Sequence, residues 1–177
     1  ADTVFSQLDE VIGQTSPTDS FAAEITTSLF SQFRATPAGF LMIDGQAGDP
    51  ASEAMRHCSA IRMAGGLAMQ LLGIGVNGHV GFNEPGSPDS SRCRVVDLAA
   101  STIQRNGYDT GMQGITLGIA DILAAEQIIL VATGAAKAAA ISAMINGPKT
   151  PDCPASLLRD HPDIRLFLDK EAAGQIS

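Results

Sequence analysis

Short apolar runs alternate with amphipathic stretches along this chain. Runs of four to eight apolar residues bounded by turn signals predict buried strands, and apolar residues spaced three or four positions apart predict helices. The predicted strands are 39–43, 68–74, 94–98, 127–133 and 164–168, and 5–12 is a shorter apolar segment. The predicted helices are 21–33, 51–63, 101–106, 119–125, 134–145 and 154–159. Pro17-Thr18-Asp19 predicts a helix start, with Asp19 or Thr18 as N-cap.

The order strand, loop, helix predicts an α/β fold, with flanking helices on a sheet that is mostly parallel. We expect a Rossmann-like three-layer αβα domain spanning residues 1–177. The loop before the 119–125 helix carries Gly114 and Gly118. In such folds, ligands bind at the carboxyl ends of the strands.

The acidic net charge of the chain limits the kinds of molecule that it is expected to bind. The net charge of −8 and the pI of about 4.6 argue against nucleic acid, whose phosphates are met by basic patches. A small phosphorylated ligand stays compatible, because one lysine and a few backbone N–H groups can hold a phosphate. No apolar run has the length needed to span a bilayer, so no membrane partner is expected.

Cysteine and histidine spacing bears on metals and on location. The three cysteines form no C-x-x-C pair, which argues against a disulfide framework or a cysteine-rich zinc site. The three histidines, His57, His79 and His161, lack the spacing of an HExxH metal motif. We therefore expect a cytoplasmic protein without a metal.

The candidate chemistry lies directly after the 68–74 strand, in the segment LLGIGVNGHVGFNEPG. Gly73, Gly75 and Gly78 allow the backbone to turn tightly and to approach a ligand. A G-x-G-x-x-G run is also found in dinucleotide-binding domains. Here it continues into a loop carrying His79 and Glu84, and no second strand ending in an acidic residue follows at the expected distance, which argues against a nicotinamide-binding domain.

A histidine near a carboxylate is a usual acid–base arrangement, because the carboxylate orients the ring and tunes its pKa. The alternative is a histidine bonded to backbone and a glutamate that is only solvated. Composition alone leaves both interpretations open for His79 and Glu84.

The string GIGVNGHVGFNEPGS resembles the signature of glucosamine-6-phosphate and galactosamine-6-phosphate deaminases (isomerases). Further segments resemble that family in the same order along nearly the whole chain. They are QLDEVIG at 7–13, SRCR at 91–94, GITLGI at 114–119, TGAAKA at 133–138, and PASLL at 154–158 with His161.

The resemblance implies an aldose–ketose isomerisation of an amino-sugar 6-phosphate, with loss of the 2-amino group as ammonia and no metal or organic cofactor. It implies that Asp9 is the base that moves a proton between C2 and C1 of the open-chain sugar. His79 would open the pyranose ring, Glu84 would be its partner, and Asn77 would belong to the same catalytic group.

The substrate-binding residues implied by the resemblance are Gly75, Gly78, Lys137 and Glu10. Lys137 follows a predicted strand at a helix start, where a cation and backbone N–H groups together suit a 6-phosphate. Without the resemblance, an exposed helical lysine would be the simpler interpretation. A homo-oligomer is left open.

The chain departs from the family pattern at three places. No Gly/Thr/Ser-rich phosphate loop precedes Asp9, so the domain is expected to lack the usual N-terminal strand and phosphate loop. Either the chain is a fragment, truncated at its N-terminus relative to the family, or it lacks part of the usual phosphate site. Asn77 stands where many glucosamine-type members have Asp, and it can hydrogen-bond an imidazole but carries no charge. Tyr108 stands where some glucosamine-type members have Arg, which together with GITLGI and PASLL resembles the galactosamine type more closely.

Two other functions on the same fold compete with this interpretation. A sugar-lactone hydrolase of the 6-phosphogluconolactonase type shares the glycine-rich core, but Phe82-Asn83-Glu84-Pro85 argues against it. A non-catalytic sugar-phosphate sensor would need no proton relay, so the presence of Asp9, His79 and Glu84 together disfavours it.

Overall fold

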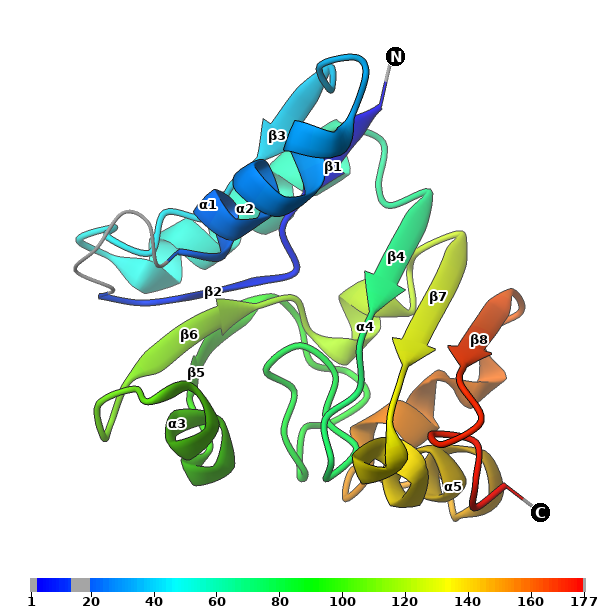
Figure 1. The fold of residues 1–177 in the computed structure, drawn as a ribbon. Helices are drawn as coiled ribbons and strands as arrows, with labels where there is room; N and C mark the ends of the chain where they lie inside the picture. Colours follow the sequence, from blue (N-terminus) through cyan, green and yellow to red (C-terminus); the bar gives the residue numbers. More distant parts are fainter. Residues whose placement is uncertain (1–2, 14–19, 177) are drawn as a thin grey trace. The chain divides into compact units, whose positions relative to one another are not determined.

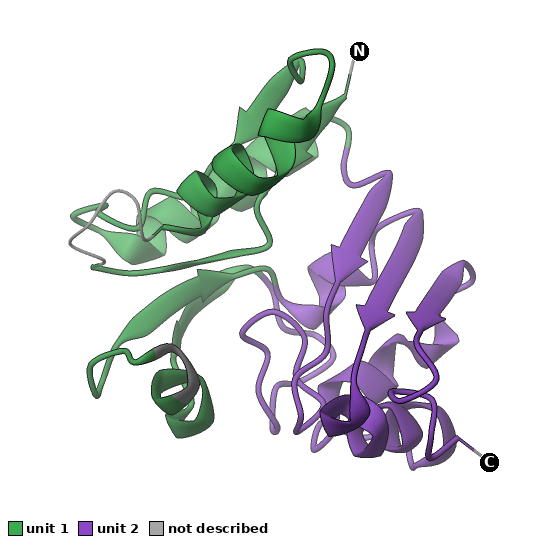
Figure 2. Ribbon diagram, in the orientation of Figure 1, with its two compact units in different colours: residues 1–65, 93–117 green, residues 66–92, 118–177 purple. Residues whose placement is uncertain are grey.

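The computed structural model describes residues 3–13 and 20–176. The chain divides into two compact units, one made of residues 1–65 and 93–117 and the other of residues 66–92 and 118–177 (Figure 2). Each unit is built from two separate stretches of the chain.

The first unit contains two small sheets (Figure 1). Strand β1 (Val4–Ser6) pairs in parallel with β3 (Gly39–Leu41). Strand β6 (Gln113–Thr116) lies between β2 (Asp9–Val11) and β5 (Arg94–Asp97) and is antiparallel to both. The chain thus leaves one sheet and joins the other between Ser6 and Asp9.

Two of the three α-helices described in the first unit, α1 and α2, begin at a residue whose side chain caps the helix. Helix α1 (Phe21–Glu24) continues through a π-helical segment, Ile25–Leu29, and a 3-10 segment, Phe30–Gln32. Helix α2 (Pro50–Met63) starts at Asp49, whose carboxylate accepts from two backbone N–H groups, and α3 spans Ala100–Asn106. Ile43, Ala54 and Ile115 form a buried cluster in this unit.

The second unit is built on a parallel sheet in the order β4-β7-β8 (Figure 1). Its strands are β4 (Met69–Leu72), β7 (Gln127–Ala132) and β8 (Ile164–Leu168). Its helical segments are α4 (Ile119–Ile122), η3 (Ala135–Lys137), α5 (Ala138–Asn146) and η4 (Pro154–Asp160). Alternate residues of β7, among them Ile128 and Leu130, are fully buried, whereas Leu71 and Phe167 are more than half exposed.

Two local predictions are corrected by the structure. Residues 113–116 are predicted from the sequence to be part of a loop, but they form the central strand β6. The strand exists because Gly114 pairs with Val11 on one side and with Val96 on the other. No pattern in the sequence indicates this strand, because glycine is not typical of strands. The N-cap of α1 is Ser20, whose hydroxyl accepts from Ala23 N at 3.1 Å. Thr18 and Asp19 lie outside the described residues.

The α/β class is confirmed, with parallel and antiparallel sheets together. The parallel pairs are β1–β3, β4–β7 and β7–β8, whereas the predicted mostly parallel sheet did not include the antiparallel β2-β6-β5 sheet. The three-layer arrangement and the single domain over 1–177 stay predictions. Across residues 3–13 and 20–176, no helix has both the length and the apolar character needed to cross a membrane.

Candidate active site

The glycine-rich loop follows the carboxyl end of β4 and closes on itself. Gly75 N donates to His79 O at 2.8 Å, and Gly78 N donates to Gly75 O at 3.0 Å. Gly78 has φ +85°, in the region that favours glycine. Gly78 O also accepts from Ala155 N at 2.9 Å, which ties the loop to η4. The loop is therefore a fixed turn at the strand end predicted for ligand binding.

His79, Glu84 and Asn77 are brought together by this loop. His79 Nδ1 lies 3.2 Å from Glu84 Oε1, and the two side chains are 25% and 18% exposed. The approach is close enough for charge pairing, but His79 Nδ1 lacks an aligned hydrogen bond within the part of the chain that the structure describes. Catalytic hydrogen bonds are often loose before substrate binds, so this geometry suits a relay that tightens in the complex.

Asn77 is hydrogen-bonded to both the histidine and the glutamate. Its Nδ2 donates to Glu84 Oε2 at 2.8 Å, and its Oδ1 accepts from His79 N at 3.2 Å. The amide therefore fixes the Glu84 carboxylate while the other carboxylate oxygen faces the imidazole. An aspartate at this position could not donate to Glu84 in this way.

Gly75 makes room for the imidazole. A Cβ on Gly75 would overlap three atoms of the His79 ring, so the ring lies directly against the Gly75 backbone. Gly78 is similarly constrained, because a Cβ there would lie 2.6 Å from Cys153 Sγ. Both glycines thus shape the loop around His79, and their predicted contact with substrate stays a prediction.

We expect Gly75→Ala to displace the His79 ring and to lower kcat by about 10²-fold, the effect of a misplacement of about 1 Å. Gly73→Ala is the matched control, because a Cβ on Gly73 meets no atom within 4 Å. Steady-state kinetics and thermal unfolding of both variants check this. Equal activity of the two alanine variants would contradict the close packing of His79 on Gly75.

Lys137 reaches the same strand end from a different element. It closes the 3-10 turn that follows β7, and its Nζ donates to Ile74 O at 2.6 Å. The cation is therefore held beside the start of the glycine-rich loop. A positive charge there, with the start of α5 directly behind it, is compatible with binding a phosphate.

Asp9 and Glu10 lie in the first unit, on β2, and face different surroundings. Glu10 is 1% exposed. Its carboxylate accepts from Gln7 Nε2, Val11 N, Phe21 N and Ala22 N at 2.9–3.1 Å. It therefore anchors the start of α1 to β2, while its predicted contact with substrate stays a prediction.

The carboxyl of Asp9 has a strongly raised pKa. Burial raises the pKa of its half-buried carboxyl from 3.8 to about 7, and the negative charge of Glu10 adds to the rise. A base is most effective when its pKa lies near the working pH, because it is then ionised yet still basic. Perturbed carboxyls of this kind gather at functional sites.

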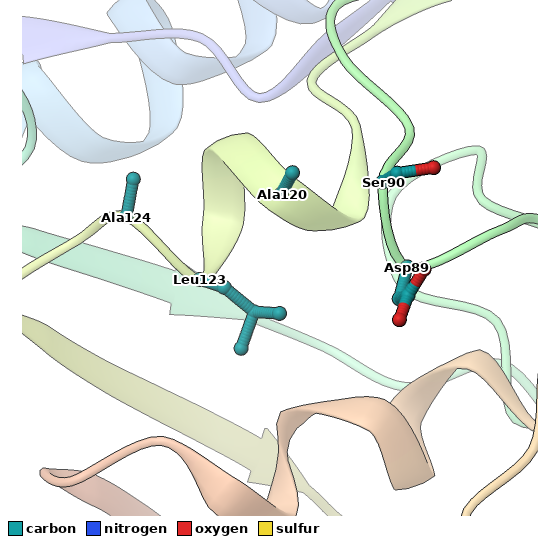
Figure 3. A pocket seen from close by; sticks show the side chains of 5 residues that line it. All are labelled: Asp89, Ser90, Ala120, Leu123 and Ala124. Atoms are coloured by element: carbon teal, nitrogen blue, oxygen red, sulfur yellow. The ribbon is translucent and has the colours of Figure 1, made fainter.

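Two shallow depressions lie elsewhere on the second unit. The first has a volume of about 370 Å³ and is lined by Asp89 and Ser90 opposite Ala120, Leu123 and Ala124 (Figure 3). The second, of about 270 Å³, shares Asp89 and Leu123 with the first. None of the predicted site residues lines either one, and the titratable groups beside the glycine-rich loop are the stronger evidence for chemistry.

Sequence reasoning did not anticipate that residues 153–155 support the glycine-rich loop. Cys153 packs on Gly78 and Ala155 N binds Gly78 O across more than seventy positions of sequence. The only signal available was the family-like PASLL segment itself. Contacts between distant segments of this kind depend on the tertiary fold.

The fold and these groups define an α/β protein in which a histidine and a glutamate lie together in a glycine-rich loop at the end of a parallel strand. The comparisons with known proteins are specific. The family model for glucosamine-6-phosphate isomerases/6-phosphogluconolactonase matches residues 2–166. The chain belongs to this family.

Two similar proteins carry the same name. Glucosamine-6-phosphate deaminase of Rhodopirellula baltica is 48% identical over 119 residues, which cover 64% of this chain and 47% of that protein. The protein of the same name from Alkaliphilus metalliredigens is 38% identical over 173 residues, covering 94% of this chain and 72% of that protein. The matched part thus spans about half the length of the first relative and about three quarters of the second.

Solved structures agree on the fold. A monomeric glucosamine-6-phosphate deaminase superposes with a TM-score of 0.86 at 32% identity, covering 96% of this chain and 73% of the other. The 6-phosphogluconolactonase of Trypanosoma brucei superposes with a TM-score of 0.71 at 22% identity, covering 98% of this chain and 74% of the other. The second likeness is one of fold alone.

Proposed function

We propose that this chain catalyses the isomerisation and deamination of an amino-sugar 6-phosphate, giving a ketohexose 6-phosphate and ammonia. The observation that carries the proposal is the cluster in which Asn77 holds Glu84 at 2.8 Å and Glu84 lies 3.2 Å from His79. Such a cluster supplies a proton relay. The shared name of the relatives, glucosamine-6-phosphate deaminase, supports the same reaction.

In the first step, His79 donates a proton to the ring oxygen and takes up the proton of the C1 hydroxyl, which opens the pyranose and leaves the imidazole in its starting state. Glu84 lies 3.2 Å from the imidazole and orients the ring. Asp9 then removes the C2 proton of the open-chain aldose while the C1 carbonyl oxygen takes up a proton, and Asp9 returns its proton to C1 as the amino nitrogen loses one. The 2-amino carbon becomes an imine, and water replaces its nitrogen to give the ketone and ammonia.

Lys137 is proposed to bind the 6-phosphate. Its Nζ is fixed by Ile74 O at 2.6 Å, so the charge is held at the carboxyl end of β4. A phosphate there would add a charge-assisted hydrogen bond to this cation. Gly75 and Gly78 are proposed to form the wall beside the sugar, where a side chain would collide with His79 or Cys153.

Two epimers are candidate substrates. The names of the relatives favour glucosamine 6-phosphate. Tyr108 and the GITLGI and PASLL segments resemble the galactosamine type and favour galactosamine 6-phosphate. A 6-phosphogluconolactone hydrolase is a weaker candidate, because the likeness to a solved lactonase is limited to the fold.

Ammonia release from glucosamine 6-phosphate and galactosamine 6-phosphate, measured side by side, tests the proposal. We expect release from one epimer to be about 5 to 150 times faster than from the other, since the C4 hydroxyl is either hydrogen-bonded or left unpaired in the site, at a cost of about 1–3 kcal/mol. Hydrolysis of 6-phosphogluconolactone without ammonia release from either amino sugar would contradict the deaminase proposal.

A further inference from the structure

The strongest unexplained feature of the first unit is a buried amide beside the base. Gln7 is 1% exposed and lies where the chain passes from β1 to β2. Its side-chain oxygen accepts from Ile43 N at 2.7 Å. Its side-chain nitrogen donates to Glu10 Oε2 at 2.9 Å and to Asp9 O at 3.3 Å.

The hydrogen bond from Ile43 N to the Gln7 side chain lies just beyond the end of the backbone pairing between β1 and β3. The parallel pairing of β1 with β3 stops at Ser6 and Leu41, although Gln7 N still donates to Leu41 O at 3.1 Å. From Asp9 onward the chain pairs with β6 instead. The Gln7 side chain takes up Ile43 N, the buried donor just beyond the end of the parallel ladder. An unpaired buried N–H is costly, so the position favours a side chain that accepts a hydrogen bond.

The same side chain holds the base from two directions. It binds the backbone carbonyl of Asp9 itself, and it binds the carboxylate of Glu10, which is in turn fixed by Phe21 N and Ala22 N. The backbone oxygen of Gln7 is also bound, by His57 Nε2 at 3.0 Å. Every polar group of Gln7 is therefore used to set the path of the chain into Asp9.

We propose that Gln7 is a positioning residue for Asp9: its amide joins β3, Glu10 and the Asp9 backbone, and so fixes the carboxylate that removes the C2 proton. The inference rests on the proposed function. Gln7 touches no reacting atom in this proposal and acts through the placement of Asp9. A base displaced by about 1 Å loses about 10²-fold in rate, so the effect belongs in kcat and in the proton-transfer step.

Gln7→Met tests this, since methionine has a similar length and no hydrogen-bonding amide. We expect kcat to fall by about 10–10²-fold with KM within about twofold. We also expect the C2-deuterium isotope effect on kcat to rise, because proton transfer becomes slower relative to the other steps. The isotope effect does not depend on the fraction of enzyme that is folded, so loss of stability alone would not change it.

Gln70→Met is the matched control. Gln70 is also a buried glutamine, 7% exposed, and its side chain donates to Leu71 O at 3.0 Å in the second unit. Its isotope effect should equal that of the wild type. Gln7→Asn is a second variant for the case in which Gln7→Met does not fold. It keeps an uncharged amide but is one methylene shorter, so it cannot hold Ile43 N, Asp9 O and Glu10 at their present distances.

The outcomes are separable. Absence of ammonia release by the wild type would overturn the proposed function. An active wild type, with kcat and isotope effect unchanged in a folded Gln7→Met or Gln7→Asn, would overturn the positioning role alone. A raised isotope effect in the Gln7 variants, with none in Gln70→Met, is the expected result.

Discussion

Asp9→Asn is expected to lower kcat for ammonia release by about 10²–10⁴-fold, the contribution of a positioned general base. Asparagine has nearly the shape of aspartic acid but cannot accept the C2 proton. Because the ring-opening groups stay in place, substrate binding should change little, and the loss should appear in kcat. Ammonia release under saturating substrate measures it, and activity within about tenfold of wild type would contradict the assignment of Asp9 as the base.

The same carboxyl sets the expected pH dependence. Asp9 must be ionised to act as a base, and its pKa is raised to about 7. The activity of the wild type should therefore fall as the pH is lowered through about 7, well above the range in which an ordinary aspartate titrates. A pH profile of kcat/KM that is flat between about pH 5 and 8 would be inconsistent with a raised pKa at the base.

Stability should move in the opposite direction to activity. The folded-state pKa of Asp9 lies above the ordinary value of 3.8, so the native state favours the protonated form. This contribution is fully present below about pH 4 and is lost as the pH rises through about 7. Asp9→Asn removes the buried charge, so at pH 8 the variant should unfold at a higher urea concentration than the wild type.

Asp97→Asn provides the matched control in the same antiparallel sheet. Asp97 is exposed, and its carboxylate accepts from Gln113 Nε2 at 2.9 Å. Removing this charge should leave kcat unchanged and should add no stability at pH 8. Equal behaviour of the two asparagine variants would mean that the position of Asp9 has no special role.

Local patterns in the sequence predicted the strands and helices that are marked by an apolar run or by a helix-capping residue. The β7 strand and helix α2, with Pro50 at its start, follow from apolar runs and caps that need only neighbouring residues. Strand β6 did not follow, because Gly114 is typical of a loop and the strand exists through its pairing with β2 and β5. The sequence also did not show that the apolar segment 5–12 is divided between two sheets, because β1 pairs with β3 and β2 pairs with β6.

In the candidate site, too, groups that are close in sequence could be predicted, and contacts between distant segments could not. His79, Glu84 and Asn77 lie within eight positions of sequence, so one loop brings them together and a motif could predict them. The hydrogen bonds of the Glu10 carboxylate to the start of α1 could not be predicted. They depend on Phe21 N and Ala22 N, which lie more than ten positions further along the chain. The raised pKa of Asp9 also depends on burial, which a sequence pattern does not give.

His79→Ala is expected to lower kcat by about 10²–10³-fold, within the range of a general acid. The cause differs from that in the Asp9 variant, because this change slows ring opening and leaves the base intact. The C2-deuterium isotope effect should therefore fall toward one, since proton abstraction no longer limits the rate.

His161→Gln is the matched control for this last experiment. His161 is a buried histidine of the same unit, and its Nε2 is bound to Ala125 O at 2.8 Å while Nδ1 accepts from Asp163 N at 3.2 Å. Both of its nitrogens serve the fold, so glutamine there should lower the unfolding temperature without changing the isotope effect. His79 has Glu84 on one nitrogen and a side chain that is 25% exposed, which leaves the imidazole accessible to substrate. An isotope effect that rises in His79→Ala would instead assign His79 to the proton transfer at C2, and ring opening would then need another acid.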